Sequence, residues 1–222
     1  MADIKYYGHK WLDKFLHQRY FNDLEKRICM EAGAYDGVAM SSCKIFEDNM
    51  GWKCINIEAN PDLYEELVVN REKSINLNIA LSDKEGLMTF QIPKRQKHGH
   101  LVGPNGVLPH LSAICKNRNN TIKGKVCEVR ATTYKKLVEE LNIEKLDLFV
   151  LDIEGWEPMA IKGMTGAEVL PDVMCVEVCA SVNEITNYDD VIREVFDDLY
   201  VKHSKCWVNY IYVKRGSRYE KL

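Results

Sequence analysis

The sequence predicts an α/β protein built on a single open, doubly wound and mostly parallel sheet that is flanked by helices. Short apolar runs typical of buried strands alternate with segments of helical periodicity along most of the chain. Strands separated by helices pair in parallel through right-handed crossovers. At 222 residues the chain is long enough for one sizeable core, so we expect one domain spanning residues 1–222.

The elements follow from local pattern. Apolar side chains near helical spacing predict an N-terminal helical segment within residues 1–25, centred on 5–21. Apolar runs predict strands, and amphipathic stretches between them predict helices. Strands are expected at 28–30, 53–57, 75–81, 87–92, 146–151, 173–178 and 208–213, and helices at 41–49, after Pro61, at 133–141, after Glu157 and at 189–200. Residues 93–126 lack periodicity and predict a functional loop.

Composition excludes several classes of protein. No apolar run approaches the roughly 20 residues that span a bilayer, and the N-terminus has no signal-peptide core, so we expect a cytoplasmic protein without a membrane partner. A net charge of −3 argues against nucleic acid as the main partner. The eight cysteines form no C-x-x-C pair and favour buried free thiols over zinc or disulfides.

The stretch I-C-M-E-A-G-A-Y-D-G, from Ile28 to Gly37, is expected to be the first strand and its ligand loop. Gly33 would allow a sharp turn beside a ligand, and Gly37 would let the next segment pack close to the strand. The glycine spacing differs from the dinucleotide pattern, which seats a pyrophosphate. Glu31 would repel phosphate and suit an ammonium group. S-adenosylmethionine, which has an ammonium, a sulfonium and no phosphate, fits these features.

A second acid supports a nucleoside ligand. Glu58 ends the second expected strand in I-N-I-E-A-N-P, 27 residues after Glu31. Doubly wound folds place near this position the carboxylate that accepts hydrogen bonds from a ribose diol. The alternative is a solvated loop acid.

A third cluster of acids follows the most apolar strand. Asp152, Glu154 and Glu157 lie within six residues, and Glu177 lies inside a later apolar strand. Acids at a buried strand end are costly unless they are paired with protons, cations or a ligand. Because clustered carboxylates suit Mg²⁺ or Mn²⁺, Asp152, Glu154 and Glu177 are a candidate metal site.

Six motifs follow one another over roughly residues 5–215: E-A-G-A-Y-D-G-V, S-S-C-K-I-F-E, G-W-K-C-I-N-I-E-A-N-P, N-I-A-L-S-D, L-D-L-F-V-L-D-I-E-G-W-E and I-K-G-M. In this order and spacing they resemble the FkbM-type S-adenosylmethionine-dependent methyltransferases. The resemblance implies a class I Rossmann-like methyltransferase fold that acts mostly on hydroxyl oxygens, often of sugars.

The resemblance also implies residue roles, from the cofactor loop to the acceptor. The cofactor loop would be formed by Glu31, Gly33 and Ala34, with Tyr35 and Gly37 beside them; Asp36 and Ser42 would lie at the methionine part, Glu58 at the ribose, Ala59 and Asn60 beside the adenosine, Ala80 and Ser82 at the adenine, and Asp152, Ile153 and Glu154 at the methyl group and acceptor. The chain has Ser41-Ser42-Cys43 where family members often have S-N-T, and Gly8-His9-Lys10 where they often have G-Q-D.

Methyl transfer from a sulfonium is an in-line displacement that depends mainly on alignment of the reacting atoms. A sugar hydroxyl needs a base or a metal ion to loosen its proton. Asp152 or Glu154 is the first candidate base, and His98 or His100 the second. The acceptor is expected to be a free or glycan-linked sugar, shaped by the loop at 93–126. The alternatives are a methyltransferase on RNA ribose or protein, a silent nucleoside-binding partner subunit, and a nicotinamide oxidoreductase.

Overall fold

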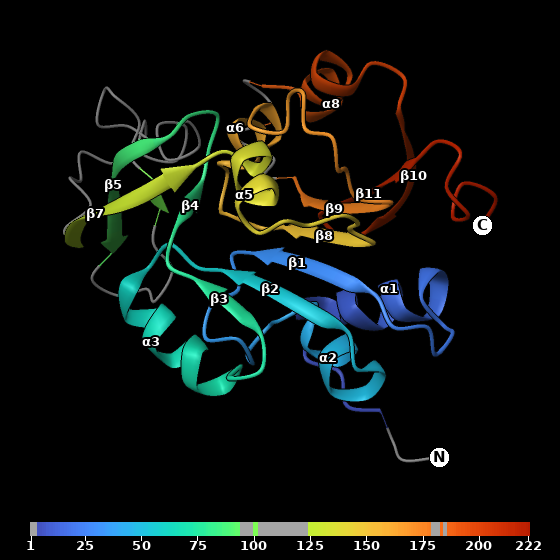
Figure 1. Ribbon diagram of the computed structural model, residues 1–222, viewed down its shortest axis with the longest axis horizontal. Coiled ribbons are helices and arrows are strands. Elements are labelled where there is room, and N and C mark those ends of the chain that lie inside the picture. The colour runs from blue at the N-terminus through green and yellow to red at the C-terminus, as the bar shows by residue number, and fades with distance from the viewer. Residues whose placement is uncertain (1–3, 94–99, 102–123, 179–182, 184–185) are drawn as a thin grey trace.

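The computed structural model describes residues 4–93, 100, 101, 124–178, 183 and 186–222, and its centre is a seven-stranded sheet (Figure 1). The strand order is β10-β11-β9-β8-β1-β2-β3. The strands are β1 (Ile28–Ala32), β2 (Lys53–Ile57), β3 (Ile75–Leu77), β8 (Leu148–Leu151), β9 (Val173–Glu177), β10 (Tyr200–Cys206) and β11 (Asn209–Lys214). All pairs among β3, β2, β1, β8 and β9 are parallel, while β11 pairs antiparallel with β9 and β10. The expected mostly parallel α/β sheet is confirmed.

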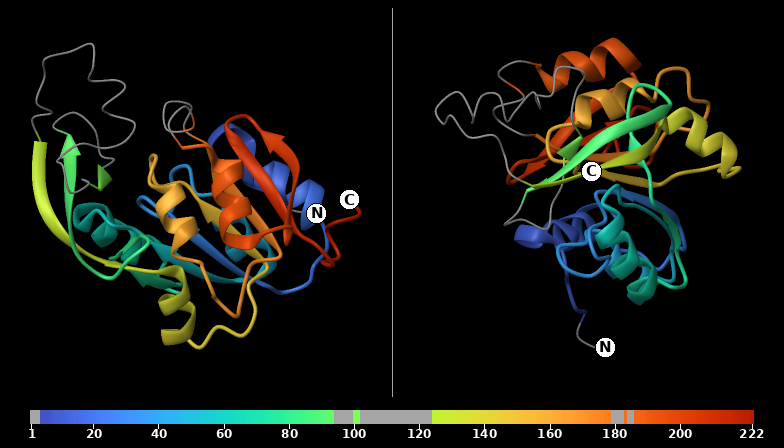
Figure 2. Two further views of the ribbon diagram at one scale, coloured as in Figure 1. Left: turned by 90° about the horizontal axis from the view of Figure 1, so that it is seen from above. Right: turned by 90° about the vertical axis from the view of Figure 1, so that its left-hand side faces the viewer.

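A second sheet of four strands corrects the expectation of a single sheet. It has the order β4-β7-β5-β6 and comprises β4 (Ala80–Leu81), β5 (Gly86–Pro93), β6 (His100–Leu101) and β7 (Gly124–Thr132). Figure 2 shows β5 and β7 on the side of the molecule away from β10. The run expected as one strand at 75–81 therefore divides between two sheets, because Ala80 and Leu81 pair with Ala131 and Thr132 of β7 instead of with β2.

The expected loop at 93–126 is shorter than predicted. Its first residue ends β5, its last three residues open β7, and residues 100 and 101 form β6. Residues 94–99 and 102–123 lie outside the described part of the chain. The β7 strand pairs antiparallel with β5 through residues 124–131, so three residues of the expected loop belong to the small sheet.

Seven helical elements surround the two sheets in the described part of the chain. They are η1 (His9–Trp11), α1 (Leu12–Tyr20), α2 (Lys44–Met50), α3 (Pro61–Asn70), α5 (Tyr134–Glu140), α6 (Glu157–Lys162) and α8 (Tyr188–Phe196). Side chains of Asn60, Thr133 and Asn187 cap α3, α5 and α8 by accepting backbone N–H groups that have no partner inside the helix. Within the described ranges, no helix has the length and apolar character needed to cross a bilayer.

The helix expected at 189–200 ends four residues early, and the strand that follows it was missed. Asp197 adopts a left-handed φ of 53°, which stops α8 at Phe196, and β10 begins at Tyr200. As the outermost strand, β10 pairs with one neighbour, and several of its side chains are polar and partly exposed. An edge strand of this kind lacks the apolar run of a buried strand.

The large sheet has an apolar core on each face. In β8, Phe149 and Leu151 pack with residues of α5, α6 and α8, whereas Leu148 and Val150 pack with residues of α1 and α2. Successive side chains of a strand point to opposite faces, so a strand covered on both faces is apolar throughout. This double burial explains why 146–151 was the clearest strand signal in the sequence.

The described cysteines are free thiols, as predicted. Cys29, Cys43, Cys54 and Cys175 are buried, while Cys127 and Cys206 are partly exposed, and Cys115 and Cys179 lie outside the described residues. Cys29 and Cys54 are register partners on β1 and β2, with their sulfur atoms 3.1 Å apart. Burial is the main cause that raises the pKa of Cys43 to about 12 and that of Cys175 well above its ordinary value.

Candidate functional site

A cavity of about 270 Å³ opens at the carboxyl ends of the parallel strands. Its walls include Gly33 after β1, Glu58 after β2, Asp152 after β8 and Glu177 at the end of β9. Phe90 of β5 adds part of the small sheet. Ligand sites of open parallel sheets lie at this edge, where strand order reverses. In the large sheet the order reverses at β1, which stands between β2 and β8.

Most of the expected site residues line this cavity. They are Glu31, Gly33, Tyr35, Ser42, Glu58, Ala59, Ala80, Asp152, Ile153, Glu154 and Glu177. The expected residues Ala34, Asp36, Gly37, Asn60 and Ser82 are described but are not part of its wall. His98 lies outside the described residues, and of His100 the structure describes the backbone in β6.

Two residues outside the cavity wall, Asp36 and Gly37, fix the shape of the loop after β1. Asp36 Oδ1 accepts hydrogen bonds from the backbone of Val38 at 2.8 Å and Ala39 at 2.7 Å. Gly37 has a φ of +80°, and a Cβ there would stand 2.6 Å from side-chain atoms of Leu67 and Arg71. Gly37 therefore permits close contact with the C-terminal end of α3. The expectation from the sequence was a close contact with the first strand.

Three other expected residues support neighbouring segments. Asn60 Oδ1 accepts from the backbone of Asp62 at 3.0 Å and starts α3. Ser82 Oγ accepts from the indole of Trp156 at 3.2 Å and so joins the end of β4 to the segment before α6. The backbone N–H of Ala34 donates to the carbonyl of Ile57 at 3.0 Å, which ties the loop after β1 to β2.

Glu31 is 3% exposed and anchors the same loop from within. One of its carboxylate oxygens accepts from the hydroxyl of Ser41 at 2.6 Å and the other from the backbone N–H of Ser42 at 2.5 Å. Burial raises the pKa of Glu31, although the charge of Arg71 and these hydrogen bonds act in the opposite direction. Glu31 thus borders the cavity and also fixes the segment that leads to α2.

Glu58 is held between two loops. Its Oε2 accepts from the backbone N–H of Tyr35 at 2.9 Å, and its Oε1 accepts from that of Asn60 at 2.8 Å. Burial raises its pKa to about 7, and the backbone donors oppose this effect. A carboxylate fixed in this way has unused lone pairs and can accept hydrogen bonds from a diol in the cavity.

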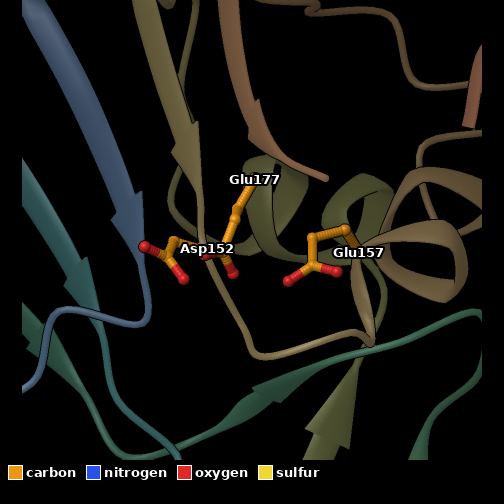
Figure 3. A group of neighbouring side chains, drawn as sticks. All are labelled: Asp152, Glu157 and Glu177. Atoms are coloured by element: carbon orange, nitrogen blue, oxygen red, sulfur yellow. The ribbon is translucent and has the colours of Figure 1, made fainter. Parts of the chain in front are cut away.

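Three carboxylates gather at the other end of the cavity (Figure 3). One oxygen from each of Asp152, Glu157 and Glu177 lies within 4.8 Å of the others. The sequence-based candidate set, Asp152, Glu154 and Glu177, differs from this group in having Glu154 in place of Glu157. Glu154 and Gly155 adopt left-handed φ values of 59° and 95°, and the turn that they form brings Glu157 back toward Asp152.

The contacts of Glu157 do not fit a metal ligand. Its Oε1 accepts from the backbone N–H groups of Ile153 at 2.8 Å and Gly155 at 3.0 Å, and its Oε2 accepts from the hydroxyl of Tyr188 at 2.7 Å. Three of about four lone-pair positions are therefore already in use. We derive no step through a metal ion at this cluster.

The three carboxyl groups all have raised pKa values. Burial and the negative charge of Glu177 raise the pKa of Asp152 well above its ordinary value. Burial, followed by the charge of Glu157, raises the pKa of Glu177 to about 7, and burial raises that of Glu157 to about 7. Carboxyl groups that titrate near neutral pH suit proton transfer better than ordinary acids do.

Some residues of the site escaped the sequence-based prediction. His9, Met40 and Phe90 line the cavity, and Arg71 supports its loop from α3. For His9 the sequence did contain a signal, since Gly8-His9-Lys10 stands where family members often have G-Q-D. No local signal marks Arg71, which follows the last residue of α3 and yet is 1% exposed, because its burial depends on the loop that folds over it.

Comparisons with known proteins identify the family of the chain and a solved structure with a similar fold. Residues 31–203 match the family model of the Methyltransferase FkbM domain. A similar solved structure is that of Methyltransferase FkbM from Methylobacillus flagellatus KT, with a TM-score of 0.51 and 12% identity over 90% of this chain and 50% of that one. This likeness shows the fold, and the chain spans about half the length of that protein. No curated protein sequence matches significantly. Because the family model covers well over half of the chain, the protein belongs to the FkbM family of methyltransferases.

Proposed function

We propose that the protein is an S-adenosylmethionine-dependent O-methyltransferase, a single class I Rossmann-like domain that methylates a hydroxyl group of a sugar or glycan. The observation that carries this proposal is the cavity itself. It joins a fixed carboxylate, Glu58, to a proton-holding cluster around Asp152 across one continuous wall. Family membership supplies the reaction type, and the two ends of the cavity supply places for the donor and the acceptor.

The β2 end of the cavity suits the nucleoside. Glu58 accepts hydrogen bonds from the ribose hydroxyls, and the apolar side chains of Ile79, Ala80 and Leu81 contact the adenine. The amino-acid part extends toward Glu31, whose charge favours an ammonium group and disfavours phosphate. When bound, S-adenosylmethionine supplies an electrophilic methyl group.

The β8 and β9 end suits the acceptor. Asp152, in its ionised form and paired with Glu177, would take the proton of the acceptor hydroxyl, so that the oxygen could bond to the methyl carbon as the bond from that carbon to the sulfonium sulfur breaks. Glu154 lines the same end and orients the acceptor. Positioning of the reacting atoms in line supplies most of the rate.

The test incubates the protein with S-adenosylmethionine labelled in its methyl group and a panel of free and glycan-linked sugars, with and without EDTA. We expect label on one sugar, turnover that persists in EDTA, and a loss of turnover in Asp152→Asn with cofactor binding retained. Glu168→Gln is the control, because Glu168 is exposed and outside the cavity.

Other outcomes identify the alternatives. Tight cofactor binding without transfer to any acceptor would indicate a silent nucleoside-binding module. Label on RNA or protein would replace the sugar as acceptor, and unchanged turnover in Asp152→Asn would remove Asp152 as the base. Calorimetric binding of NAD in place of S-adenosylmethionine would contradict methyl transfer altogether.

A further inference from the structure

An exposed tryptophan contacts His9, one of the residues that line the cavity. Trp207 is 55% exposed and belongs to the two-residue turn between β10 and β11, closed by the pair Cys206 and Asn209. Asn209 is the register partner of Glu177, and the carbonyl of Val208 accepts from the backbone N–H of Val178 at 3.0 Å. The turn is therefore fixed to the segment that carries the acid cluster.

The N-terminal segment meets the same turn. His9 lines the cavity and is exposed, which places it at the rim. Its ring lies 5.5 Å from that of Trp207, at an interplanar angle of 70°. Lys10 Nζ lies 4.4 Å from the centre of the indole ring. The exposed indole thus lies beside His9 of the cavity wall, with the ammonium group of Lys10 over one face of its ring.

The backbone is strained where this surface is built. Trp207 has a φ of 56° in a two-residue hairpin turn, where left-handed positions are usually taken by Gly, Asn or Asp. Lys10 and Met40 have φ values of 51° and 63°, and a bridge between Gly8 and Met40 holds the N-terminal segment to the loop after β1. Strain of this kind persists chiefly at functional sites, where the surrounding structure enforces it.

We propose that Trp207, His9 and Lys10 form an acceptor subsite that binds one sugar ring of an oligosaccharide, next to the ring whose hydroxyl is methylated. The C–H face of a sugar packs on the part of the indole that Lys10 leaves exposed, and its hydroxyl groups bond to the neighbouring imidazole and ammonium groups. The inference rests on the proposed function, because it extends the acceptor end of the same cavity.

The variant Trp207→Gly is the sharpest test, and Trp11→Gly is its matched control. Like Trp207, Trp11 is exposed, at 66%, and has a left-handed φ, of 63°. Both changes therefore remove an exposed indole and place glycine at a position with positive φ. The described part of the chain gives Trp11 no ring contact with His9 and no place in the cavity wall. Glycine accepts positive φ, so neither variant should lower the melting temperature.

Saturation-transfer NMR in the presence of S-adenosylhomocysteine would measure binding of cellotriose, maltotriose and chitotriose to the full chain. We expect at least one trisaccharide to bind the wild type and Trp11→Gly equally, and to bind Trp207→Gly roughly tenfold more weakly, the effect of losing one aromatic contact. Equal binding to both variants, or no trisaccharide binding to the wild type, would overturn the subsite.

The parallel methyl-transfer assay separates the two proposals. Trisaccharide binding that depends on Trp207, without transfer of label to any acceptor, would support the subsite and refute methylation of sugars. Transfer to a monosaccharide by a protein that binds no trisaccharide would support the proposed function and refute the subsite.

Discussion

The carbonyl oxygen of Asp152 lies so close to the backbone of Gly33 that a Cβ atom on residue 33 would stand 1.7 Å from it. The loops after β1 and β8 are thus in direct contact beneath the cavity. Gly33 also has a φ of +84°, a conformation that L side chains rarely adopt. We had expected the glycine to make room for a ligand, and it also makes room for the residue proposed as base.

The substitution Gly33→Ala should therefore lower the free energy of unfolding by about 3–5 kcal/mol, at the upper end for a single change. The backbone of Asp152 cannot move away without breaking β8 pairing. Gly216→Ala is the control, since Gly216 has a similar φ of +76° but no atom within 4 Å of its Cβ position. It should lose roughly 1–2 kcal/mol from strain alone. Urea unfolding measures both, and equal losses would contradict the steric role of Asp152.

Glu58→Gln should weaken binding of S-adenosylhomocysteine about 10- to 100-fold, the range for losing a hydrogen bond to a charged group. The amide would also direct an N–H group at the backbone donors of Tyr35 or Asn60, which both face the carboxylate. Isothermal calorimetry measures the affinity. Asp62→Asn, an exposed change four residues further on, serves as control, and an unchanged affinity of Glu58→Gln would argue against a ribose contact.

Arg71→Met should lower the free energy of unfolding by about 3–5 kcal/mol and also weaken cofactor binding. The guanidinium is hydrogen-bonded to Glu47, to the carbonyl of Gly37 at 3.1 Å and to the hydroxyl of Ser41 at 3.3 Å, so its loss leaves a partly buried acid without this partner and frees the loop. Lys125→Met removes an exposed, solvent-screened ion pair with Asp62 and should leave the free energy of unfolding nearly unchanged. Similar losses in the two variants, measured by urea unfolding, would contradict this.

The stability of the protein should fall as the pH rises from about 5 to 8. Glu157 is fully buried and has a pKa of about 7 against an ordinary 4.5, so the folded state binds its proton more tightly than the unfolded state does. The stabilisation that Glu157 contributes is therefore fully present below its ordinary pKa of 4.5 and is lost as the pH rises through about 7. At 1.36 kcal/mol per pKa unit this loss is up to about 3 kcal/mol.

Glu157→Gln should flatten this dependence, because the amide oxygen still accepts from Ile153 and Gly155 and no longer titrates. Glu168→Gln, at an exposed position, should leave the dependence as in the wild type. Urea unfolding at a series of pH values gives the slopes. The same slope in Glu157→Gln and in the wild type would assign the dependence to other groups, of which Glu58 is the first candidate.

Much of the site could be predicted because its signals are local. A strand buried on both faces is apolar throughout, and the residue that follows it at the carboxyl end faces the ligand crevice. Glu58 and Asp152 are both in this position, directly after β2 and β8. Two apolar runs and the acids that end them were therefore enough to find both ends of the cavity.

The parts that were missed depend on contacts between distant segments. Glu157 joins Asp152 only because the intervening turn is left-handed, and Arg71 is buried only because the loop after β1 closes over it. Likewise, Ala80 leaves the large sheet because β7 offers it a partner about 50 residues later in the chain. None of these contacts changes the periodicity of the local sequence, so none could be predicted from it.

Alkylation of two buried thiols can report local opening of the central sheet. Cys29 and Cys54 lie side by side between β1 and β2, where an alkylating reagent can reach them only after these central strands separate. Reagents react with the thiolate, and both thiols have raised pKa values that disfavour it. Burial is the main cause at Cys29, whereas at Cys54 the hydrogen bond with Cys29 comes first and burial second. The rate at which they are alkylated in the native protein therefore measures how often β1 and β2 separate. Comparison of that rate with and without a bound ligand would show how much a ligand in the cavity stabilises the pairing of β1 with β2.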